Sequence, residues 1–246
     1  MQNDNSFITR VQRLKHQTGA VVAVLVDDCF TYDEIDRHII AGMSVAEIRI
    51  DMFQNQDINH IQNEIRKFAD VPILATIRKT IDGGLWNGPE KERIELFKSI
   101  IPHVGAVDVE LSEPESLSEL KEAVSDHQCN LIASYHNFDQ TPYDETLYGL
   151  INQAKDVNAN AVKLACMINN EKDCSRLAAL FEIEVDIPKI IIGMGPKGMS
   201  TRIKFPALGS LVTYSPSDKI IPAYGQISFS EMIDQLGDFY PTFKSE

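Results

Sequence analysis

Eight short runs rich in apolar and β-branched residues recur along the chain at a mean spacing of roughly 27 residues, close to the length of one strand–helix unit. The runs are Val21–Val26, Val45–Ile50, Pro72–Ile77, Ala106–Leu111, Asn130–Ser134, Ala161–Ala165, Lys189–Gly193 and Ser210–Tyr214. The segments between them with helical spacing of apolar residues are Ile58–Phe68, Glu92–Ile101, Tyr143–Val157 and Asn170–Glu184. Eight such units in about 250 residues predict an α/β fold, a (β/α)8 TIM barrel.

A doubly wound open sheet is the alternative architecture. That fold usually places a glycine-rich phosphate-binding turn after its first strand, whereas residues 27–30 of this chain are Asp-Asp-Cys-Phe. Nothing in the composition along the chain marks a linker or a low-complexity segment. We therefore predict a single TIM-barrel catalytic domain over residues 1–246.

The charge of the chain narrows the classes of partner. Its 23 Lys and Arg residues against 36 Asp and Glu residues give a net charge of −13, which argues against binding to nucleic acid or to an anionic membrane surface. The longest apolar run, Gly19–Val26, is too short to span a bilayer, and the N-terminal residues lack the apolar core of a signal peptide. The four cysteines form no C-x-x-C pair, so we expect reduced thiols in a cytoplasmic protein.

Charged residues gather where the predicted strands end. Glu47, Arg49 and Asp51 share one face of the second strand, and Asp108 and Glu110 share one face of the fourth. In a TIM barrel the carboxyl ends of the strands form the mouth that holds the active site. The alternative for each group alone is a row of ion pairs that faces the helices.

The sixth predicted strand places Lys163 inside an apolar run. A buried lysine must reach solvent, pair with a carboxylate or lose its charge, and a neutral amine is a nucleophile toward carbonyl carbons. A structural ion pair with Glu110 or Glu47 is the alternative. The fifth strand ends at His136, whose imidazole is suited to acid–base chemistry near neutral pH, although a single histidine is more often structural.

Two loops rich in glycine follow other strands. The third strand ends at Arg78 and continues into Asp82-Gly83-Gly84, which fits either a surface turn or a close approach to a ligand. The seventh strand leads through three glycines to Arg202, a plausible site for a phosphate or a carboxylate.

Seven motifs occur in a fixed order along most of the chain: E-I-R-I-D, T-I-R-(x)3-D-G-G, D-V-E-L, S-Y-H-N-F, V-K-L-A, M-G-(x)2-G-(x)2-T-R and Y-G-Q-I-S. This ordered set resembles the type I 3-dehydroquinate dehydratases of the shikimate pathway. The resemblance implies a cytoplasmic homodimeric TIM barrel that eliminates water from 3-dehydroquinate to give 3-dehydroshikimate, in aromatic amino-acid biosynthesis. It also implies a lysine Schiff base, with no metal and no organic cofactor.

By this resemblance Lys163 is the Schiff-base lysine and His136 the general acid and base. The residues that match substrate-binding positions of the family are Glu47, Arg49, Arg78, Arg202, Gln226 and Met194. Arg202 matches the arginine that pairs with the substrate carboxylate. The residues that match supporting acids are Asp82, Asp108 and Glu110.

The chain departs from the family pattern at three places. Asp82 stands where the family commonly has a glutamate, Pro222 where it often has a serine, and the first strand lacks a serine. Two further hypotheses stay open: a class I aldolase that uses the same lysine, and an inactive homologue that only binds a ligand.

Overall fold

The computed structural model describes residues 6–223 and 225–243, in which strands and helices alternate. The strands are β1 (Val22–Val26), β2 (Val45–Arg49), β3 (Ile73–Thr76), β4 (Ala106–Glu110), β5 (Asn130–Asn137), β6 (Ala161–Met167), β7 (Lys189–Met194) and β8 (Thr213–Pro216). The helices are α1 (Phe7–Thr18), α2 (Tyr32–Ala41), α3 (Ile58–Arg66), α4 (Glu90–Ile100), α5 (Pro114–Asp126), α6 (Asp144–Asp156), α7 (Glu171–Ala179), α8 (Thr201–Leu208) and α9 (Phe229–Phe239).

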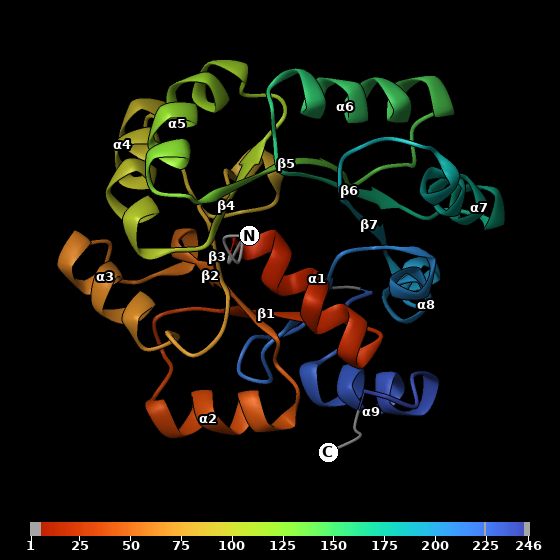
Figure 1. Cartoon of the computed structure of the whole chain (residues 1–246), viewed down its shortest axis with the longest axis horizontal. Coiled ribbons are helices and arrows are strands. Elements are labelled where there is room, and N and C mark those ends of the chain that lie inside the picture. Colours follow the sequence, from red (N-terminus) through yellow and green to blue (C-terminus); the bar gives the residue numbers. More distant parts are fainter. Residues whose placement is uncertain (1–5, 224, 244–246) are drawn as a thin grey trace, which may run out of the picture.

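The strands form one parallel sheet in the order β7-β6-β5-β4-β3-β2-β1-β8. Each strand therefore lies beside its neighbour in the chain, and β1 pairs with β8, as in a barrel; a doubly wound sheet reverses its strand order. Between β7 and β8 the described residues form no ladder, but Leu211 N donates to Lys189 O at 2.8 Å near the start of both strands. The predicted TIM barrel is confirmed, and helices surround it (Figure 1).

The predicted strands differ from the observed ones mainly at their ends. β5 continues past Ser134 because its ladder with β6 extends to the pair Asn137 and Cys166. β8 begins at Thr213 rather than Ser210, because the Ser210 hydroxyl donates to Val212 O and accepts from Ile191 N. The predicted helix Asn170–Glu184 is an α-helix only as far as Ala179, followed by a short 3-10 turn.

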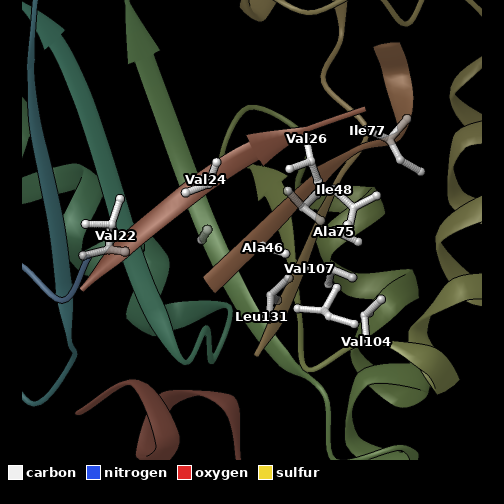
Figure 2. Packing of buried hydrophobic residues seen from close by; sticks show 14 of the residues in the cluster. Val22, Val24, Val26, Ala46, Ile48, Ala75, Ile77, Val104, Val107 and Leu131 are labelled. Atoms are coloured by element: carbon white, nitrogen blue, oxygen red, sulfur yellow. The ribbon is translucent and has the colours of Figure 1, made fainter. Parts of the chain in front are cut away.

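Period-two alternation divides the core into two layers. Val22, Val24 and Val26 of β1 pack toward the helices together with Ala46 and Ile48 of β2 (Figure 2). The alternate residues Ala23 and Leu25 belong instead to the cluster inside the barrel. Because every strand obeys this alternation, the residue parity along a strand decides which side chains enter the barrel.

Helix α1 closes one end of the barrel. Its apolar residues Phe7, Ile8 and Val11 are buried against the interior cluster, and Ile8 N donates to the Asn130 side chain at the start of β5 at 2.9 Å. Figure 1 shows α1 lying across the centre of the strands. The amino ends of the strands are thereby covered, which leaves the carboxyl ends as the open mouth.

Candidate active site

The polar residues of alternate strand positions meet at the mouth of the barrel. Nine of the eleven predicted site residues line one cavity of about 180 Å³ there: Glu47, Arg49, Arg78, Asp82, His136, Lys163, Met194, Arg202 and Gln226. The other two, Asp108 and Glu110, contact Arg78 directly. A larger hollow of about 1030 Å³ lies beside α1 at the opposite end and contains none of the predicted site residues.

Lys163 faces the interior of the barrel and is 4% exposed. Its Nζ donates to Asp108 Oδ2 at 2.9 Å and lies 3.6 Å from Glu47 Oε1. The same nitrogen lies over the Tyr214 ring, 4.1 Å from the centroid. The amine is therefore held between two carboxylates and an aromatic face, on the wall of the cavity rather than among the helices.

A chain of buried ion pairs continues from Asp108. Arg78 donates to Asp108 Oδ1 and to Glu110 Oε1, each at 2.7 Å, and the Ser134 hydroxyl donates to Asp108 Oδ1 at 2.6 Å. Burial alone raises the pKa of the Asp108 carboxyl, but the nearby Arg78 and Lys163 cations hold this pKa well below its usual range. Asp108 is therefore an anion that holds Lys163 and Arg78 in place.

Arg49 and Asp51 form a separate pair at the end of β2. The strand ends at Arg49, so Asp51 lies in the following 3-10 turn. Arg49 Nε and Nη2 bind the two oxygens of Asp51 at 2.8 and 2.6 Å, and Asp51 also accepts from Leu85 N at 3.1 Å. Through these hydrogen bonds, Asp51 connects the glycine-rich loop after β3 to Arg49 at the end of β2.

His136 extends from β5 one strand away from Lys163, because Ser134 pairs with Lys163 and His136 with Ala165. Burial, together with the Arg78 and Lys163 cations, lowers the pKa of His136 well below its ordinary value. The imidazole is thus neutral at neutral pH and able to accept a proton. Neither His136 Nδ1 nor Asp82 Oδ2 has a hydrogen-bond partner in the described part of the chain.

Arg202 is a buried cation that also lines the cavity, in the first turn of α8. Its Nη1 donates to Tyr214 O at 3.0 Å, whereas Nε has no partner among residues 6–223 and 225–243. No carboxylate of the described residues forms an ion pair with Arg202, and burial lowers the pKa of its guanidinium to about 10. A buried cation without a counter-ion is suited to binding an anion.

The loop after β8 brings Gln226 to the cavity. Gly225 lies so close to the Gly195 backbone that a Cβ on it would come within 2.3 Å, so a larger residue cannot occupy this position. Gln226 Oε1 accepts from Ala223 N at 2.8 Å, which holds the amide within its own loop. The neighbouring Tyr224 of the Y-G-Q-I-S motif lies outside the described residues.

Comparison with known proteins places these features in a family. The model of the type I 3-dehydroquinase family matches residues 21–240. The chain belongs to this family. The resemblance predicted from the seven ordered motifs is therefore confirmed.

Several proteins named 3-dehydroquinate dehydratase resemble this chain over most of its length. A 3-dehydroquinate dehydratase of Thermodesulfovibrio yellowstonii is 32% identical over 201 residues, which cover 81% of this chain and 87% of that protein. One of Methanothermobacter thermautotrophicus is 33% identical over 205 residues, covering 83% and 89%. The solved 3-dehydroquinate dehydratase of Geobacillus kaustophilus has a TM-score of 0.81 at 27% identity, covering 92% of this chain and 93% of that one.

Tyr214 and Arg93 are among the residues in and around this type I site that were not predicted. Tyr214 lines the cavity. The alternation of side chains along β8 could have predicted this, because Tyr214 is on the interior face beside Ala23 of β1. Arg93 is fully buried and donates to Glu110 Oε2 at 2.7 Å; it has helical spacing with the buried residues Phe97 and Ile100 of α4. A charge on the apolar face of a helix is the signal that could have identified Arg93.

Neither a metal cage nor a membrane span is found in the described residues of this family member. No group of three or more His, Cys, Asp or Glu side chains there could hold a metal ion. None of the helices there is both long enough and apolar enough to cross a membrane.

Proposed function

We propose that the protein is a 3-dehydroquinate dehydratase that forms a Schiff base between Lys163 and the substrate ketone, with His136 as general base and then general acid. The observation that supports this most directly is that the buried Lys163 amine and the neutral His136 imidazole line the same cavity. Because the chain belongs to the type I 3-dehydroquinase family, we take 3-dehydroquinate as the substrate.

The reaction begins when the Lys163 ammonium gives up a proton and the resulting amine adds to the ketone carbon. Loss of water then gives an iminium, which is a stronger electron sink than the ketone. His136 removes a proton from the carbon next to the iminium, and the electron pair forms an enamine. The enamine expels the hydroxyl group of the following carbon, which takes the proton back from His136 and leaves as water. A further water hydrolyses the iminium and frees Lys163.

Arg202 positions the substrate for these steps. Its guanidinium is buried and has no counter-ion within the described residues, so the substrate carboxylate supplies the missing anion. Gln226 and Met194 line the same cavity, where they contact the ring. A carboxylate fixed at Arg202 orients the ketone toward Lys163, which lines the same cavity.

The remaining predicted residues contact the substrate hydroxyl groups or balance the charges of the site. Glu47 and Arg49 contact substrate hydroxyl groups, while Arg78 lines the cavity with its fork turned toward Asp108 and Glu110. Asp82 assists His136 only through water or after a local movement, since its side chain is one methylene shorter than a glutamate. The resemblance also implies a cytoplasmic homodimer that works without metal or organic cofactor.

The test is to add 3-dehydroquinate and follow the ultraviolet absorbance of the conjugated product. With sodium borohydride and substrate, we expect an irreversible adduct on Lys163, located by peptide mapping. Lys189 is the matched control, since it is also buried but donates to Leu180 O and Ile183 O outside the cavity. No absorbance change from folded protein, or an adduct on Lys189 instead, would refute the proposal.

A further inference from the structure

Tyr214 contacts both cations that the proposed reaction uses. Its ring lies under the Lys163 amine, 4.1 Å from centroid to Nζ, and its backbone carbonyl accepts from Arg202 Nη1 at 3.0 Å. It extends from β8 into the cavity beside the gap between β7 and β8, where the described residues form no ladder. Tyr214 is thus the residue between the Schiff-base lysine and the carboxylate-binding arginine.

The hydroxyl group of Tyr214 is buried and has no hydrogen-bond partner in the described part of the chain, although the side chain is only 4% exposed. Buried hydroxyl groups almost always have a partner, because an unpaired one keeps its full cost of desolvation. Burial, with the charges of Glu47 and Asp108, raises the pKa of Tyr214 well above its ordinary value. The hydroxyl therefore stays protonated, a donor without an acceptor in the described residues, on a side chain that lines the cavity.

The aromatic ring has a separate effect on Lys163. A cation over the face of a tyrosine is attracted by the π-electrons, most strongly where water is excluded. An iminium on the same nitrogen is also a cation, so the attraction persists after the Schiff base forms. The ring face thus holds the nitrogen in both states, in addition to Asp108.

We propose that Tyr214 is a further substrate-binding and positioning residue: its hydroxyl donates to an oxygen of the substrate bound between Lys163 and Arg202, and its ring face holds the lysine nitrogen. This inference rests on the proposed function and adds to it a residue that the sequence motifs do not contain. The two roles belong to different atoms, so two substitutions separate them.

Tyr214→Phe keeps the ring and removes the donor. We expect the KM for 3-dehydroquinate to rise roughly three- to tenfold, with kcat within about twofold of wild type, because a bond present in both ground and transition state is lost. The melting temperature without substrate stays equal or rises, since the lost hydroxyl had no partner. A purely structural role gives the opposite pattern, with a lower melting temperature and an unchanged KM.

Tyr214→Leu removes the ring as well. We expect borohydride trapping at saturating substrate to slow by about tenfold relative to Tyr214→Phe, because the amine loses one side of its binding site. Tyr135→Phe is the matched control: its hydroxyl accepts from Asn137 Nδ2 and the side chain packs against the helix-facing core, so KM and trapping should stay at wild-type values.

The outcomes distinguish this inference from the proposed function. A wild-type KM in Tyr214→Phe would overturn the role of the hydroxyl, and wild-type trapping in Tyr214→Leu would overturn the role of the ring. If the wild-type protein itself forms no adduct with 3-dehydroquinate, the proposed function fails first.

Discussion

Two groups of polar residues surround the cavity, and they differ in whether their atoms have partners. In the paired cluster, Glu47, Arg78, Asp108, Glu110, Ser134 and Lys163, the charged atoms bind one another or a neighbouring side chain. In the unpaired set, Asp82, His136, Arg202 and Tyr214, each side chain has a buried polar atom without a partner in the described residues.

The difference separates two requirements of an active site. The paired cluster is complete without a ligand, so its geometry is set by the fold and is ready before substrate arrives. The polar atoms of the unpaired set have no hydrogen-bond partners until a polar ligand binds. Contacts to these atoms should therefore contribute most to the free energy of substrate binding. The predictions below test this division by disturbing each group separately.

Replacing Lys163 has the largest expected effect. Lys163→Arg keeps a cation beside Asp108 but removes the nucleophile, so we expect turnover to fall by more than about 10⁴-fold with little change in stability. Lys163→Ala should lose turnover equally, and it should also lose stability because Asp108 keeps its charge with one partner fewer. Turnover and urea unfolding measure the two effects. Measurable turnover in Lys163→Arg would contradict the assignment.

His136→Ala removes the base and keeps the lysine. We expect turnover to fall by about 10²- to 10⁴-fold, while borohydride with substrate still labels Lys163. Mass spectrometry of the trapped protein distinguishes this outcome from loss of binding. Turnover close to wild type would exclude His136 as the acid–base group.

Arg93 tests the paired cluster from outside, through its ion pair with Glu110. Arg93→Met leaves the buried Glu110 without one of its two arginines, and we expect the free energy of unfolding to fall by about 3–5 kcal/mol. Lys98→Met on the same helix is the control, because Lys98 pairs with Glu95 at the surface and its loss should change stability little. Equal urea midpoints for the two variants would show that the cluster does not stabilise the fold.

Arg202 tests the unpaired set, with the opposite effect on stability. Arg202→Met removes a buried cation without a counter-ion, so the substrate-free protein should lose no more than about 1 kcal/mol, the worth of its hydrogen bond to Tyr214 O. The KM for 3-dehydroquinate should rise by roughly ten- to a hundredfold, because the substrate carboxylate loses its cation. A large loss of stability with an unchanged KM would place Arg202 with the structural residues instead.

Much of this arrangement could be predicted from the sequence. Period-two alternation grouped Asp108 with Glu110 on one face of its strand because a strand allows only two faces, and an interior face and a helix-facing one both stayed open. The motif order predicted the family, and through it which cavity residues to expect. These predictions rest on local geometry and on ordered spacing along the chain.

The pairing of the charges could not be predicted in the same way. The sequence suggested Glu110 or Glu47 as the partner of Lys163. Glu47 does lie 3.6 Å from its nitrogen, but Asp108 is nearer at 2.9 Å. Glu110 pairs with Arg78 and Arg93 instead. Arg93 reaches Glu110 from a helix, so the contact depends on how α4 packs against β4. Helix α1 was also missed, since Phe7, Ile8 and Val11 indicate a helix only weakly until the end of a barrel is there to bury them.

The smallest expected effect is on the pH dependence of activity, which tests whether the cations of the paired cluster change the pKa of His136 in the unpaired set. Because burial and the Arg78 and Lys163 cations lower the pKa of His136, the base stays unprotonated below the ordinary imidazole value of about 6.5. We therefore expect kcat/KM to hold through pH 6.5 and to fall only at lower pH, with thermal melts at each pH to separate unfolding. In Lys163→Met, which removes one of the cations, the His136 titration followed by NMR should move toward higher pH. An unchanged titration in that variant would mean that the paired cluster does not act electrostatically on the unpaired set.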